Sequence, residues 1–216
     1  TLDNDTFSYN STNWFGGGIS AMWSSPTIKN CNIINNQSFY YYTGFGGGGM
    51  VAFGEGSFPV IEDTYIAGNA TANEGGGIYF DGAEGASLNR VTIVNNSSDR
   101  WNGGMSIQGT PVTITNCTIA GNSSPNGGGI ELWDGSTADI SNSIIYGNAP
   151  TAISLYEGNS VTVKYSDIEG SWEGAGNIDA EPLFVNVFSS PPDYNLQIGS
   201  PCIDAGTADI DQDGTD

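Results

Sequence analysis

The sequence predicts an all-β protein, a right-handed parallel β-helix (a solenoid) of about six to seven coils with three strands per coil. Three observations support this fold class: a repeat of mostly 26 residues, a high glycine content of 32 in 216 residues, and only four helix-favouring Lys and Arg. Counted from the first aliphatic residue of each copy, the intervals are 26, 33, 27, 26, 26 and 23 residues. These residues are Leu2, Ile28, Ile61, Leu88, Ile114, Ile140 and Val163.

Each copy contains a second apolar position five residues after the first. A small or mixed residue lies two positions before it, and a spacing of two predicts side chains on one face of a strand. Like residues should therefore stack from coil to coil and fill the core. The second apolar column consists of Phe7, Ile33, Ile66, Ile93, Ile119, Ile145 and Ile168.

A repeated Asn follows this column by three positions in the first six copies. The residue before it is Asn or Gly in all but one copy, where it is Tyr9. Asn and Gly enter the left-handed backbone region at low cost, so each coil should turn there. We expect the repeated Asn side chains to point inward and form a hydrogen-bonded ladder. They are Asn10, Asn36, Asn69, Asn96, Asn122 and Asn148.

A third strand per coil is predicted after a loop of variable length. Glycine runs lead into most copies of this strand, whose first inward residues are Ile19, Met50, Ile78, Met105, Ile130 and Ile153. These runs precede no amphipathic helix and carry no Lys, which excludes a phosphate-binding loop. The spacing of Ile28 to Asn36 also fits the opening of a leucine-rich repeat. That fold needs a helix or irregular apolar stretch on the return, whereas here the return is glycine-rich.

These motifs resemble those of a known family. Phe7-x-x-Asn10 with Gly17–Gly18–Ile19, and Ile119-x-x-Asn122 with Gly128–Gly129–Ile130, are similar to the FxxN and GGA-I/L/V repeats of polymorphic outer-membrane proteins and related surface β-helices. The resemblance covers about residues 1–155 and implies a surface-displayed adhesive or structural module. The chain departs from it by having Ile where most of those repeats have Phe, and Gly where they have Ala.

The domain organisation follows the repeat. Residues 1–170 are predicted to form the coils, and residues 171–206, where the period is lost and prolines appear, a C-terminal capping segment. The stretch from Tyr165-Ser-Asp-Ile-Glu-Gly, through Asn177-Ile-Asp-Ala-Glu-Pro-Leu-Phe, to Ser200-Pro-Cys-Ile-Asp-Ala-Gly206 looks like the closing part of secreted β-helix proteins of environmental bacteria. Residues 207–216 form an acidic tail. The residues expected to cover the open end are Leu183, Phe184, Val185, Tyr194, Leu196 and Ile198.

Charge narrows the possible partners. With 24 acidic residues, four basic residues and no His, the formal net charge is −20. Such a chain repels nucleic acid and anionic membranes. No apolar run is long enough for a membrane helix, so membrane insertion is not expected. The repeat is already in register at Leu2, and we expect a longer, secreted or cell-surface precursor of bacterial origin.

The three cysteines are predicted to be unpaired and mostly buried. Cys31 and Cys117 occupy the same position three copies apart. At the strand spacing they would lie roughly 14 Å apart, too far for a disulfide. Cys202 is alone in the C-terminal segment.

The variable loops between the repeated Asn and the glycine run carry the candidate binding residues. Exposed aromatic side chains on adjacent coils would form a stacking surface for sugar rings, or would shield the loops' own backbone. The candidates are Trp14, Phe15, Phe39, Tyr40, Tyr41, Tyr42, Phe45, Arg100 and Trp101.

The acidic tail contains one metal-binding pattern. Alternating Asp followed by Gly is typical of a calcium loop of the EF-hand or dockerin kind. The sequence therefore predicts a calcium site that residues beyond Asp216 would complete; the alternative is a solvated acidic end. The candidate ligands are Asp209, Asp211, Asp213 and Asp216.

The functional hypothesis is a non-catalytic extracellular or surface module for adhesion, glycan binding or structural assembly. Its partner would be a polysaccharide or cell-surface glycan, or another copy joined end to end in a fibre. The alternative is a polysaccharide lyase or glycoside hydrolase, which needs a paired set of carboxylates or a suitable base. No catalytic motif is evident, and Arg90 is expected to form a surface ion pair with Asp63 on the neighbouring coil.

Overall fold

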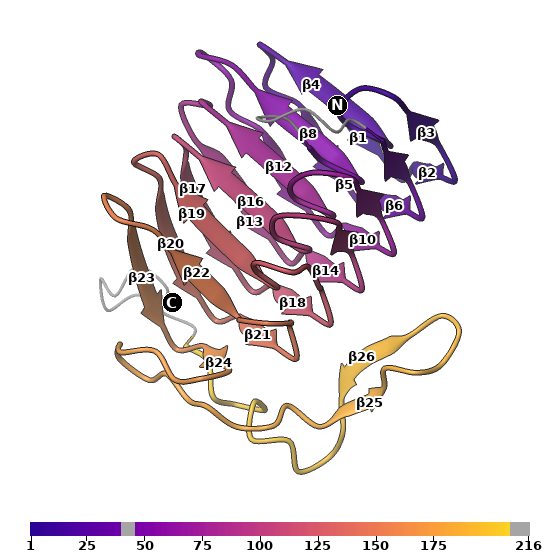
Figure 1. Ribbon diagram of the computed structural model, residues 1–216. Coiled ribbons are helices and arrows are strands. Elements are labelled where there is room, and N and C mark those ends of the chain that lie inside the picture. The colour runs from indigo at the N-terminus through magenta and orange to yellow at the C-terminus, as the bar shows by residue number, and fades with distance from the viewer. Residues whose placement is uncertain (40–45, 208–216) are drawn as a thin grey trace.

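The computed structural model describes residues 1–39 and 46–207. In this part the chain is built from β-strands without a helix, and it winds about six times around one axis (Figure 1). Within the same residues there is accordingly no helix that could span a membrane. The predicted parallel β-helix is confirmed.

Two parallel sheets run along the whole stack in the described residues. Sheet A contains seven strands: β1 (Leu2–Asp3), β5 (Thr27–Lys29), β9 (Val60–Glu62), β13 (Ala86–Asn89), β17 (Pro111–Thr115), β20 (Thr137–Ser141) and β23 (Ser160–Lys164). Sheet B also contains seven: β2 (Thr6–Ser8), β6 (Asn32–Ile34), β10 (Tyr65–Ala67), β14 (Thr92–Val94), β18 (Thr118–Ala120), β21 (Ile144–Tyr146) and β24 (Asp167–Ile168).

The return side of each coil contains two further parallel sheets. Sheet D is the predicted third strand of the coil, with β4 (Ile19–Met22), β8 (Met50–Phe53), β12 (Ile78–Asp81), β16 (Met105–Gln108), β19 (Ile130–Trp133) and β22 (Ile153–Leu155). Sheet C was not predicted: it adds a two-residue strand after the repeated Asn in the first four coils. Its strands are β3 (Ser11–Thr12), β7 (Gln37–Ser38), β11 (Ala70–Thr71) and β15 (Ser97–Ser98).

The core is formed by the apolar columns, in the predicted register. Ile28 pairs with Leu2 and Ile61, although one of these intervals is longer than the other by seven residues. Ile66 of sheet B and Ile78 of sheet D are likewise paired along their columns and fully buried. The length difference between copies is therefore absorbed by a loop, and the strands keep their alignment.

The turn between sheets B and C is left-handed, as predicted. The backbone φ is 54° at Asn35, 64° at Gly68 and 56° at the exceptional Tyr9. The residue after each of these turn positions is a member of the Asn ladder. Each Asn of the ladder donates through its backbone N and its Nδ2 to Oδ1 of the Asn on the following coil, up to Asn148. For Asn69, both donors lie 2.9 Å from Oδ1 of Asn96. The ladder closes a buried turn that would otherwise leave backbone groups unpaired.

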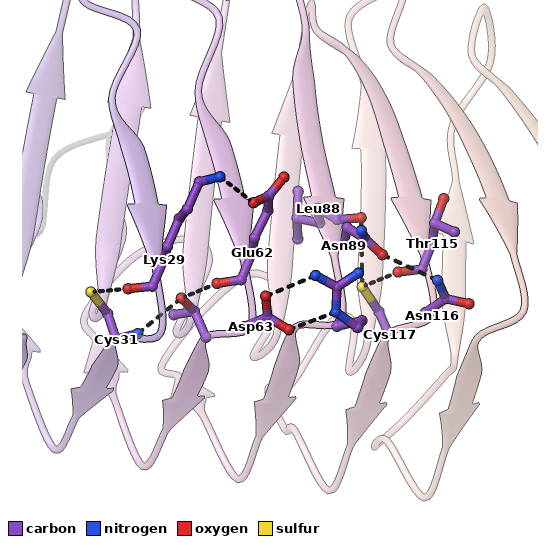
Figure 2. Close-up of polar contacts among 11 residues, drawn as sticks. Lys29, Cys31, Glu62, Asp63, Leu88, Asn89, Thr115, Asn116 and Cys117 are labelled. Atoms are coloured by element: carbon purple, nitrogen blue, oxygen red, sulfur yellow. Dashed lines mark hydrogen bonds and ion pairs between the residues drawn. The ribbon is translucent and has the colours of Figure 1, made fainter. Parts of the chain in front are cut away.

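A second left-handed column, which the sequence analysis missed, lies between sheets A and B. In this column φ is 53° at Asn30, 47° at Asp63 and 55° at Arg90. The expected ion pair of Arg90 with Asp63 is confirmed, with Nε 2.6 Å from Oδ1 (Figure 2). Cys31 and Cys117 follow this turn, and all three thiols are free, as predicted.

Residues 171–180 lie against the last coil. Trp172 packs on the main hydrophobic core. Oδ1 of Asn177 accepts a hydrogen bond from the backbone N of Ser166 at 3.1 Å, and its Nδ2 donates to the carbonyl oxygen of Val163 at 3.0 Å. An Asn thus pairs with the final coil in the way that ladder residues pair with one another.

Residues 183–198 of the predicted cap do not cover the open end of the stack. Strands β25 (Phe184–Asn186) and β26 (Asp193–Leu196) form an antiparallel hairpin that packs on the outer face of sheet B, beside the lower coils in Figure 1. Tyr194 donates from Oη to Oδ1 of Asn95 at 3.0 Å. Leu183, Val185 and Ile198, expected to cover the open end, are instead exposed.

Candidate functional site

The aromatic candidates that the structure describes lie on segments between sheet C and sheet D. We call the described aromatic members Trp14, Phe15, Phe39 and Trp101 the loop edge. Trp14 is 64% exposed, Phe39 49% and Trp101 36%. The candidates Tyr40, Tyr41, Tyr42 and Phe45 lie outside the described residues. Trp14 and Trp101 are three coils apart, about 14 Å along the axis at the strand spacing.

The structure brings one end of the loop edge together with residues of sheet D. The rings of Trp14 and Phe15 are edge to face at 6.0 Å, and Phe15 contacts Phe53 in the same way at 5.6 Å. Phe53 also meets Trp23 at 5.1 Å, and Trp23 is 69% exposed. The sequence analysis did not select Trp23 and Phe53, because it searched the variable loop before the glycine run. Both residues lie after that run, at the end of their sheet D strands.

The outer face of sheet D is unexpectedly buried. Strand pairing aligns Val51, Tyr79, Ser106 and Glu131 in one outward column, and each is almost fully inaccessible to solvent. The glycine segments lie against this column: a Cβ on Gly75 would lie 3.2 Å from Cβ of Tyr79. The glycine segments therefore cover part of the outer face of sheet D, which the alternation of side chains along a strand would leave in contact with solvent.

A polar network joins the strands on this face. Oη of Tyr79 donates to Oε1 of Gln108 at 2.5 Å, and Nε1 of Trp133 donates to Oγ of Ser106 at 3.3 Å. Ser106 in turn donates to Oε2 of Glu131 at 3.4 Å. The network links the third, fourth and fifth coils.

Two buried carboxyl groups belong to this region. Burial, together with the charges of Glu131 and Asp81, raises the pKa of Glu74 to about 7, and Arg100 opposes the shift. Burial also raises the pKa of Glu131, while hydrogen bonds from Tyr156 and Ser106 act against this. Neither residue could be recognised from the sequence, because Glu74 lies in a loop and Glu131 alternates with the inward-facing Ile130 and Leu132.

Two ion pairs lie on the surface of sheet A and of the turn that follows it. Nζ of Lys29 lies 2.6 Å from Oε2 of Glu62, next to the pair of Arg90 with Asp63 (Figure 2). In residues 1–39 and 46–207, no group of three or more His, Cys, Asp or Glu side chains could hold a metal ion. The candidate calcium ligands Asp209, Asp211, Asp213 and Asp216 lie outside these ranges.

A groove of about 570 Å³ separates the C-terminal hairpin from the turns of the coils. Its walls include Asn95, Gly121 and Tyr146 on the coils and Phe184 and Phe188 on the hairpin. Among the candidates that the structure describes, none lines this groove, so it is separate from the loop edge.

Comparison with known proteins supports the fold. A family model described as "Right handed beta helix region" matches residues 76–182, from the glycine segment before β12 to the residues that follow the last coil. No curated protein and no solved structure is significantly similar to the chain.

Proposed function

We propose that this chain is a non-catalytic extracellular or cell-surface module that binds glycans through the loop edge and the adjoining aromatic residues of sheet D. The observation that carries the proposal is the exposure of Trp14 and Trp101 on corresponding loops of the stack. The exposed Trp23 is joined to Trp14 through ring contacts with Phe53 and Phe15. Large exposed aromatic side chains that extend over several coils mark a binding surface. Their flat rings can stack on sugar rings placed along the axis.

The charge of the chain favours neutral polysaccharides over acidic ones. At a net charge of −20, a uronic-acid or sulfated polymer would be repelled at long range, especially at low ionic strength. Asp81 at the end of β12 and Asp134 after β19 add to this repulsion. Neutral glucans, xylans and mannans are therefore the expected ligands.

End-to-end assembly into a fibre is a weaker proposal. A fibre requires both ends of the stack to be open for pairing. Leu2, Phe7 and Ile19 of the first coil are only partly buried, whereas the last coil is in contact with Trp172. The occupied end favours glycan binding over stacking.

A polysaccharide lyase or glycoside hydrolase is the second candidate function, and the buried Glu74 and Glu131 are the observation in its favour. Paired carboxyl groups with raised pKa are typical of acid–base catalysis. However, one oxygen of each group has almost no accessible surface, so a substrate cannot reach it in this conformation. Binding without catalysis is accordingly preferred.

The test is retention on immobilised polysaccharide. Trp14→Ala, Trp101→Ala and Tyr41→Ala should each weaken retention on the neutral polymer that the unmodified chain binds. Phe188→Ala is the matched control, because Phe188 is 95% exposed but lies on the C-terminal hairpin. Equal retention of all variants would contradict the proposal. New reducing ends or unsaturated products would assign an enzyme instead.

Two further proposals accompany this function. Secretion or surface display by a bacterium follows from the family resemblance of the repeats. Calcium binding by Asp209, Asp211, Asp213 and Asp216 follows from their spacing. Calorimetric titration of a longer chain with calcium tests the second, and the absence of binding heat would exclude it.

A further inference from the structure

Two carboxyl groups on the outer face of sheet D are poorly compensated. Glu74 is 5% exposed and Glu131 3%. Among the described residues, Oε2 of Glu74 and Oε1 of Glu131 are buried without a hydrogen-bond partner. Burying an ionised carboxylate without a donor or counter-ion is costly, so such groups usually take up a proton.

The surrounding groups increase this cost. Glu131 comes from β19, Asp81 from β12, and both repel a negative charge on Glu74. Asp134, after β19, acts in the same direction on Asp81. The nearby Arg100 is attractive, but it is the smallest of these influences.

The backbone of Glu74 is tied to the loop edge. Glu74 forms a parallel bridge with Trp101 of the next coil, and the backbone N of Trp101 donates to the carbonyl oxygen of Asn73 at 2.9 Å. On the other side, the carbonyl oxygen of Glu74 accepts from the backbone N of Gly47 at 2.8 Å. A displacement of Glu74 must therefore disturb the segment that positions Trp101.

We propose that a proton on the buried Glu74, favoured by the nearby charge of Glu131, keeps the segment 72–77 against sheet D, so that the aromatic surface carrying Trp101 is ordered when Glu74 is protonated and loosened when it ionises. The inference concerns regulation of the glycan-binding surface and rests on the proposed function for its biological meaning. The conformational equilibrium itself does not depend on any ligand.

The direction and size of the pH effect on opening of the segment follow from the linkage between proton binding and conformation. The pKa of Glu74 is raised from 4.5 to about 7, so the closed segment binds more protons than an open one between these values. Opening should increase about tenfold per pH unit across this range and level off above about pH 7. The total increase would be roughly 300-fold, the factor that corresponds to a change of about 2.5 pH units.

The experiment measures amide hydrogen exchange of residues 72–77 and 99–103 in the full chain without glycan. After correction for intrinsic exchange, opening of the unmodified chain should rise by roughly 60-fold between about pH 5 and about pH 7.5, the part of the total increase that falls in this range. Glu74→Gln should remove most of this rise, and Glu131→Gln should reduce it. Glu84→Gln, which changes an exposed carboxyl group on another turn, should leave it intact.

Three results would overturn the inference. The first is an exchange rate of the unmodified chain that does not change with pH after correction. The second is an unchanged pH dependence in both Glu74→Gln and Glu131→Gln. The third is restored protection by millimolar calcium above about pH 7, which would identify a bound cation in place of the proton. If one variant fails to fold, the other gives the same readout. Exchange is measured without polysaccharide, so failure here is distinguishable from failure of the retention assay.

Discussion

Replacement of Asn96 with Ala tests whether the Asn ladder stabilises the stack. Asn96 lies in the middle of the ladder and is fully buried. Its Oδ1 accepts from the backbone N and the Nδ2 of Asn69, and its Nδ2 donates to the carbonyl oxygen of Ile66 and to Oδ1 of Asn122, both at 3.0 Å. Every hydrogen-bonding capacity of this amide group is directed at a neighbouring coil.

The expected loss can be worked from the groups left behind. Alanine removes the acceptor of the Asn69 backbone N and the side-chain donor to the Ile66 carbonyl, and each buried group without a partner costs about 1–3 kcal/mol. The two together give about 4 kcal/mol, with a smaller addition for the missing contacts. Asn10→Ala is the matched control at the exposed end of the ladder, where one side-chain bond to Asn36 is lost, and it should cost about 1 kcal/mol.

Urea denaturation of both variants provides the measurement. Tryptophan fluorescence and circular dichroism should give coincident transitions if the stack unfolds as one unit. The free energy of unfolding is then compared with that of the unmodified chain. If Asn96→Ala costs no more than Asn10→Ala, the buried ladder does not contribute as argued, and the turn glycines and apolar columns must account for the stability of the coils.

Three further predictions use the same measurements or simple chemistry. Gly76→Ala should destabilise the chain by about 3 kcal/mol, because its Cβ would lie 2.4 Å from two carbonyl oxygens of the next coil, whereas Gly127→Ala, with nothing nearer than 3.4 Å, should be tolerated. Arg90→Ala should change the urea midpoint little, and less still in high salt, because its ion pair is exposed to solvent. Burial raises the pKa of Cys117 to about 12 and that of Cys202 to about 12, so the folded chain should react slowly with a thiol reagent near about pH 8 and expose three thiols on unfolding.

The apolar columns and the Asn turns could be predicted because the repeat makes them visible. Ile28, Ile61 and Leu88 occupy one column through two intervals of different length. A strand buried on its inner face tolerates no shift by one residue, so only the loops can change in length. Each coil also repeats the same short-range turn chemistry, and six copies of one preference outweigh the weakness of any single copy.

The remaining features depend on contacts between segments without a common period. Arg90 adopts a left-handed backbone that its own preferences disfavour, because the pairing of its neighbours on both sides imposes the turn. Tyr194 reaches Asn95 across 99 residues, and nothing in the spacing of either residue indicates that contact. Glu131 is buried although its side chain points outward from sheet D, because alternation along a strand does not reveal which loops fold over its outer face.

The C-terminal hairpin affects how the stack resists mechanical force and in which order its coils unfold. In an ordinary stack each coil is held only by the next one, so the ends can peel away in sequence. Here Phe184 and Tyr194 rest on Ala67, Val94 and Ala120, which belong to the third, fourth and fifth coils. Force applied at Thr207 would first break its two hydrogen bonds to Asn142 and would then reach the middle of the stack through the hairpin. The hairpin therefore connects several coils to one another, and it should detach from sheet B before the coils unfold from the C-terminal end.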